Sequence, residues 1–235
     1  MMQGKSVPPV SKDEVSIFFS NIVDYNTLRG SMEPATLIGM LERLFSKLDE
    51  LADTHGIQRV DAIDGCYIAA ANFSADQATD HAVRLARFAL DAVAAAGTTL
   101  LDERRPELGA VRLLAGMHCG AVCGSVVGVH GGRKHTLHGD AVNVASRMES
   151  HGAAGAVQCS AASAARIEAQ GGCAGGGLWL EPRGGGVDVK GRGHMSAFWL
   201  GGRLGCAAPR RASSCPLGPT SMSWCTEAAP VYAAR

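Results

Sequence analysis

Asn143 and Arg147 are the residues of this chain whose types and spacing best suit chemistry. Residues four apart on a helix lie on one face, one turn from each other, so an amide and a guanidinium here reach the same small ligand. The planar, always-charged guanidinium suits a developing charge on a phosphoryl group, and the amide suits a sugar oxygen. An isolated pair of this kind is more often an ordinary exposed helix face, so the surrounding elements must decide between the two interpretations.

The apolar residues around this pair are patterned as alternating strands and helices through residue 200. Leucines recur at steps of three and four between Leu37 and Leu51, which predicts a helix that ends near Gly56. Asp64-Gly65 tolerates positive φ between two β-rich runs, which predicts a two-residue hairpin turn. The predicted elements in chain order are a strand at 15–20, a helix at 33–55, strands at 57–63 and 66–71, a helix at 75–95, strands at 111–118 and 121–129, a helix at 141–150, a strand at 156–159, a helix at 161–169 and strands at 178–180, 187–189 and 197–200.

The order strand, helix, hairpin, helix, strand is typical of a ferredoxin-like sheet with helices packed on one face. The predicted fold class is therefore α+β, with a central, mostly antiparallel sheet. We expect an N-terminal extension at 1–12, one domain at 13–201, and a tail at 202–235. The tail mixes Pro, Ser, Ala and Cys without periodicity, which predicts disorder.

Charge and cysteine usage exclude several classes of partner. The 22 Lys and Arg balance 22 Asp and Glu among 235 residues, so no net field is present to hold a nucleic acid or an anionic membrane face. The eight cysteines are scattered without a Cys-x-x-Cys pair, which favours reduced thiols. No apolar run approaches the ~20 residues that span a bilayer. We expect a soluble, cytoplasmic segment, alone or as the cytosolic domain of a larger signalling or membrane protein.

The segment Gly139–Ser150 reads G-D-A-V-N-V-A-S-R-M-E-S. It resembles the signature helix G-D-T-V-N-x-A-S-R-M-E-S of class III nucleotidyl cyclases, with Ala141 in place of threonine. Other segments that match the family follow in family order between about residue 13 and residue 200. They are Ile17–Val23 (family F-S-D-I-V), Arg59–Tyr67 (K-V-E-T-I-G-D-A-Y), Gly116–Gly120 (G-I-H-T-G), Val126–Gly128 (V-V-G) and Val189–Gly193 (V-K-G-K-G).

The resemblance implies a catalytic domain that dimerises head to tail and builds its sites between two chains. The ribose 3′-oxygen of a nucleoside triphosphate attacks the α-phosphorus and pyrophosphate leaves, with two Mg²⁺ or Mn²⁺ ions on the reacting oxygens. Carried over by position, Asn143 orients the ribose, Arg147 stabilises the phosphoryl group in the transition state, and Lys190 holds the terminal phosphates.

The metal positions are where this chain departs from the family. The two metal-binding aspartates of the family fall on Asn21 and Gly65, an amide and a residue without a side chain. Mg²⁺ is held mainly through carboxylates and phosphate oxygens, so neither residue is an adequate anionic ligand. Asp64 and Asp24 are the candidate substitutes for the missing ligands. The pattern predicts a feeble homodimer and a chain that supplies the Asn, Arg and Lys of a site shared with a metal-competent cyclase subunit.

Base choice in the family turns on two positions, which are Asp61 and Thr136 in this chain. A carboxylate at Asp61 accepts from guanine N1–H and its amine, whereas it would face the unprotonated N1 of adenine, so GTP is favoured over ATP. Thr136 donates to guanine O6 or accepts from an adenine amine and decides nothing. Two alternatives stay open, an adenylate cyclase and a catalytically inactive, dimerising regulatory partner of another cyclase subunit.

Overall fold

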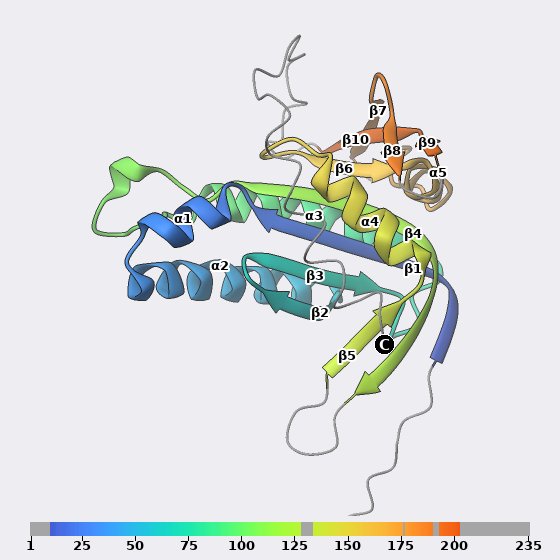
Figure 1. Ribbon diagram of the computed structural model, residues 1–235. Coiled ribbons are helices and arrows are strands. Elements are labelled where there is room, and N and C mark those ends of the chain that lie inside the picture. Colours follow the sequence, from blue (N-terminus) through green and yellow to red (C-terminus); the bar gives the residue numbers. More distant parts are fainter. Residues whose placement is uncertain (1–9, 128–133, 176, 190–192, 203–235) are drawn as a thin grey trace, which may run out of the picture.

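The computed structural model describes residues 10–127, 134–175, 177–189 and 193–202 (Figure 1). Apart from Gly202, which ends the described range, the predicted tail at 202–235 lies outside these residues, as does most of the predicted N-terminal extension. The helices and strands are β1 (Val10–Ile22), α1 (Tyr25–Ser31), α2 (Pro34–His55), β2 (Gln58–Ile63), β3 (Cys66–Ala71), α3 (His81–Gly97), the short 3₁₀ helix η1 (Pro106–Leu108), β4 (Leu113–Val127), β5 (Lys134–His138), α4 (Asp140–Ser150), β6 (Val157–Ser160), α5 (Ala161–Ala169), β7 (Leu178–Pro182), β8 (Val187–Val189), β9 (Gly193–Met195) and β10 (Ala197–Gly202).

The main sheet has eight strands in the order β2-β3-β1-β4-β6-β10-β7, with β5 paired to β4. Its pairs are antiparallel except for β4 and β6, which run parallel. The four strands β2-β3-β1-β4 stand in the ferredoxin-like order, so the predicted α+β fold class is confirmed. Among the residues that the structure describes, no helix is long and apolar enough to span a membrane.

Successive residues of β1 point to opposite faces of the sheet and enter two different cores. Phe18 packs in the larger core with α2 and α3, and its ring meets Phe88 edge to face with centroids 5.2 Å apart. Ile17 and Phe19 pack in the other core, with α4. The expectation that the helices share one face is therefore wrong for α4, which crosses in front of β4 and β1 in Figure 1 while α3 lies behind them.

Helix α2 shows how local sequence sets the boundaries of an element. Pro34 occupies the first turn, where its missing N–H has no helical partner to lose, and Gly56 ends the helix at a φ of +66°. The spacing of the leucines from Leu37 to Leu51 predicts one apolar stripe along this helix. Met40 and Ala52 in fact share this stripe with the leucines, while Leu41 and Leu51 are only half-buried.

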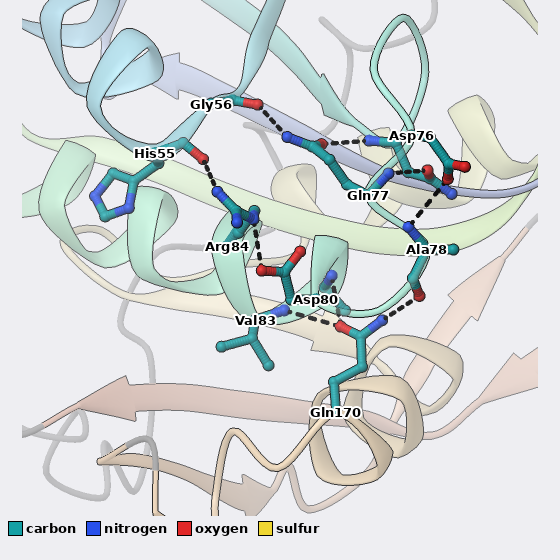
Figure 2. A network of polar contacts seen from close by, with 11 residues as sticks. His55, Gly56, Asp76, Gln77, Ala78, Asp80, Val83, Arg84 and Gln170 are labelled. Atoms are coloured by element: carbon teal, nitrogen blue, oxygen red, sulfur yellow. Dashed lines mark hydrogen bonds and ion pairs between the residues drawn. The ribbon is translucent and has the colours of Figure 1, made fainter.

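A polar network joins the end of α2, the start of α3 and the end of α5 (Figure 2). Gln170 ends α5, and its Oε1 accepts from the N–H groups of Ala82 at 2.9 Å and Val83 at 3.3 Å in the first turn of α3. Gln77 Nε2 donates to the carbonyl of Gly56 at the end of α2 at 2.7 Å. The first turn of α3 is thus capped from α5 rather than by Asp80, whose side chain makes no capping bond.

Candidate active site

Helix α4 carries the signature segment and lies unusually close to β4. A Cβ at Gly116 would stand 2.6 Å from Cα of Glu149 and nearer still to its backbone nitrogen. A Cβ at Gly120 would stand 3.0 Å from the Cβ of Ala141. Gly116 is therefore required for α4 to rest against the backbone of β4, and Gly120 leaves room for the methyl group of Ala141.

The outward face of α4 presents the pair that the sequence singled out. The buried residues of the helix face the sheet; they are Ala141, Val142, Val144, Ala145, Met148 and Glu149. Asn143 is exposed and Arg147 is half-buried on the remaining face. Among the described residues, neither the Asn143 amide nor the Arg147 guanidinium makes a hydrogen bond or ion pair. Two polar groups, one of them a full cation, thus remain available to a ligand on this face.

The buried side of α4 includes a carboxyl group. Glu149 is 5% exposed, and burial raises its pKa to about 8. The penalty on the charged form keeps this carboxyl neutral at physiological pH. It therefore adds no negative charge beneath the face that carries Arg147.

The two positions where the family has metal-binding aspartates lie side by side. Asn21 of β1 pairs with Cys66, and the N–H of the next residue, Ile22, donates to the carbonyl of Gly65 at 3.1 Å. Asp64 and Gly65 form the predicted two-residue turn between β2 and β3, with φ values of +48° and +79°. We call the place where Asn21 and Gly65 meet the metal corner. Its strand and turn are present, but its two positions carry an amide and no side chain.

Tyr25, the first residue of α1, fills the space beside Gly65. A Cβ at Gly65 would lie 2.7 Å from Tyr25 Cδ2 and 2.8 Å from Cγ. Burial raises the pKa of the Tyr25 phenol, and the nearby Asp64 carboxylate raises it further. These residues do not fit a divalent cation, since an amide and a glycine stand where the family has two carboxylates, and the phenol beside them keeps its proton. No motif or local spacing singles out Tyr25.

The predicted substitutes, Asp24 and Asp64, are both exposed and both have left-handed backbone, at φ values of +56° and +48°. Within the described ranges, no group of three or more His, Cys, Asp or Glu side chains is arranged to hold a metal ion. A role for these two carboxylates stays a prediction.

The two predicted base-reading residues come from adjacent elements. Asp61 lies on β2 next to an irregularity in its pairing with β3, and its Oδ1 accepts from the N–H of Ala62 at 3.0 Å. Thr136 lies on β5 opposite Ser125 of β4, and β5 contacts β2. Both side chains have further interactions within the chain. Lys190, the predicted phosphate-binding lysine, lies outside the described residues.

Comparisons with known proteins identify the family of this chain. The family profile "Adenylate and Guanylate cyclase catalytic domain" matches residues 7–202. Guanylate cyclase D of Mus musculus is 31% identical over 209 residues, which are 89% of this chain and 18% of that protein. Receptor-type guanylate cyclase gcy-20 of Caenorhabditis elegans is 33% identical over 211 residues, with the same coverage. This chain thus spans less than a fifth of the curated relatives it matches.

Solved structures give the same result for the fold. The guanylate cyclase domain of RhGC from Catenaria anguillulae, in complex with GTP, has a TM-score of 0.72 at 26% identity, covering 83% of this chain and 99% of that domain. The adenylyl cyclase CyaB from P. aeruginosa has a TM-score of 0.71 at 18% identity, covering 87% and 98%. The chain belongs to the adenylate and guanylate cyclase catalytic domain family, whose members generally use divalent metal ions and form dimers.

Proposed function

We propose that this chain is one half of a dimeric guanylate cyclase, which converts GTP to the 3′,5′-cyclic monophosphate and pyrophosphate. One observation carries the proposal: α4 presents Asn143 and Arg147 away from its own sheet, while the metal corner of the same chain lacks both carboxylates. A nucleotide site to which this chain contributes an amide and a cation but no metal ligand is complete only when a second chain supplies the carboxylates. The guanylate cyclases among its relatives support the choice of GTP.

In the shared site, the residues of this chain bind and orient the nucleotide. Asn143 holds the ribose so that its 3′-oxygen lies in line with the α-phosphorus, and Arg147 stabilises the charge that develops on the phosphoryl group. Lys190 binds the terminal phosphates. Asp61 accepts from the guanine N1–H and amine, with Thr136 beside it. We place the divalent ions, two Mg²⁺ or Mn²⁺, on a partner subunit that carries both aspartates.

A competing assignment keeps the metal on this chain, with Asp24 and Asp64 as ligands. It predicts an active homodimer that Asp24→Asn and Asp64→Asn each inactivate. Our assignment predicts a homodimer near background and no effect of these two substitutions when a metal-competent subunit is added, because that subunit supplies the carboxylates.

The test mixes the purified chain with a metal-competent guanylate cyclase domain at micromolar concentration. Cyclic GMP and cyclic AMP are measured with each divalent metal and each nucleoside triphosphate. We expect metal-dependent cyclic GMP production well above that of either chain alone. Production of cyclic AMP instead would establish an adenylate cyclase, and dimerisation without turnover would establish an inactive regulatory partner.

The relatives that this chain matches include receptor-type guanylate cyclases. On that ground, the chain would act as an intracellular domain of a longer receptor protein.

A further inference from the structure

Arg183, the residue that follows β7, reaches the C-terminal end of α4. Its backbone N–H donates to Ala197 O at 2.8 Å, which fixes the residue to β10. Its guanidinium carbon lies over the ring of Trp199, 5.4 Å from the centroid. Its Nη1 donates to the carbonyl of His151 at 2.6 Å and to Gln158 Oε1 at 2.5 Å. One nitrogen with two hydrogens thus serves both acceptors.

Both acceptors are connected to the last turn of α4. His151 is the C-cap residue, and its N–H and Nδ1 lie 3.2 Å and 3.0 Å from the carbonyl of Arg147. Gln158, which is fully buried on β6, approaches the sulfur of Met148 with its Nε2 at 3.7 Å. Arg183 therefore contacts His151, which contacts Arg147, and it contacts Gln158, which contacts Met148.

The guanidinium of Arg183 is directed at the C-terminal end of α4. Desolvation lowers the pKa of its half-buried guanidinium, and among the described residues no carboxylate pairs with it. The C-terminal carbonyls of a helix lack helical donors and carry the negative end of the helix dipole, so a cation is stabilised there. An arginine that merely filled space would not need a carbonyl at 2.6 Å.

We propose that Arg183 is a positioning residue that holds the last turn of α4 and so sets the place of the Arg147 guanidinium in the shared site. The role of Arg147 rests on the function proposed above, whereas the hold on α4 does not. A displacement of about 1 Å in a positioned group lowers turnover by up to ~100-fold, so the effect belongs in kcat rather than in KM.

The experiment compares Arg183→Ala, Arg183→Lys and Arg43→Ala in the full chain. Arg43 is the matched control, because it also donates to a backbone carbonyl, that of Leu100 at 3.0 Å, on the other side of the sheet from α4. Hydrogen exchange followed by mass spectrometry reports on residues 144–152. We expect Arg183→Ala to speed exchange there at least tenfold, Arg183→Lys to do so less, and Arg43→Ala not at all.

The second readout is turnover in the mixture with the metal-competent subunit. We expect Arg183→Ala to lower kcat ~10- to 100-fold while KM for GTP changes by less than about threefold. Unchanged exchange in α4, or equal changes in the Arg183 and Arg43 variants, would overturn the inference. If the unmodified mixture makes no cyclic nucleotide, the proposed function fails, and exchange alone decides the role of Arg183. Should Arg183→Ala not fold, Arg183→Lys carries both readouts.

Discussion

At the scale of single residues, Gly65 is the clearest difference between this chain and a cyclase domain that has both metal-binding aspartates. Its φ of +79° lies in the left-handed region, and the first ring atom of Tyr25 stands 2.8 Å from where its Cβ would be. Rotation of the ring about its own axis does not move that atom. A side chain at this position therefore requires Tyr25 or α1 to shift.

We expect Gly65→Ala to lower the free energy of unfolding by about 1 kcal/mol for the backbone and by a further ~1 to 3 kcal/mol for the collision. Gly56→Ala is the control, because its φ is +66° but its nearest neighbour is the end of the Gln77 side chain at 3.2 Å. Denaturant unfolding measures both variants. Equal losses would show that Tyr25 does not close the position, and a Tyr25→Ala background should remove the difference.

Glu149 gives the chain a pH dependence whose sign is set by burial. Its folded pKa of about 8 lies above the ordinary value of 4.5, so the folded state keeps a proton that the unfolded chain has released. Stability should fall as pH rises from about 4.5 to about 8 and then level off, by at most about 5 kcal/mol.

The measurement is the free energy of unfolding across that interval for the natural chain and for Glu149→Gln. The glutamine variant cannot ionise and should lose most of the decline. The same slope in both chains would mean that Glu149 is charged in the folded state.

At the scale of elements, the contact between α4 and β4 depends on Gly116. Gly116→Ala places a methyl group against backbone atoms of Met148 and Glu149. Backbone atoms cannot move aside by a change of rotamer. We expect a loss of at least ~3 kcal/mol and a displaced α4. Gly97→Ala at the end of α3 meets nothing within 4 Å and should be neutral or stabilise by up to about 1 kcal/mol. Thermal unfolding of the pair decides, and a tolerated Gly116→Ala contradicts the close approach.

The cap that Gln170 provides for α3 is a second element-scale feature (Figure 2). Gln170→Ala removes the acceptor of two N–H groups in the first turn, and we expect a loss of about 1 to 2 kcal/mol. Thr54→Ala, which removes one exposed bond within α2, should cost less than about 0.5 kcal/mol. Chemical denaturation compares them, and equal effects would mean that water replaces Gln170 at no cost.

Local chemistry explains which elements could be predicted from the sequence. The Asp64-Gly65 turn and the boundaries of α2 follow from φ preferences and a terminal Pro and Gly, and the structure confirms them. Helix α1 was not predicted, because none of its residues is buried and no apolar stripe marks it. The glycines of β4 suggested two strands, although they serve a close helix contact within one continuous strand.

The rest of the site depends on contacts between distant segments. The pairing of Asn21 with the hairpin, the ring of Tyr25 over Gly65 and the reach of Arg183 to α4 join residues that no local pattern relates. A strand buried on both faces also does not reveal which helix covers which side. For that reason the sequence predicted the α+β class but not the separate face of α4.

At the scale of the whole molecule, the chain combines a helix face that presents an amide and a guanidinium with a corner that lacks both family aspartates. Asn143 and Arg147 lie on the outward face of α4, and the corner at Asn21 and Gly65 lacks the carboxylates that the family has at these two positions. This asymmetry is the reason to expect a mixed dimer rather than two equal halves.

The most direct test of that expectation is the effect of Arg147→Ala on cyclic GMP production by the mixture of this chain with a metal-competent subunit. Loss of a donor to the developing phosphoryl charge should lower kcat by ~10² to 10³, while Arg104→Ala, on an exposed loop, should leave it unchanged. The account predicts that loss in the mixture and turnover near background for the natural chain alone. Full activity of the Arg147→Ala mixture would contradict it.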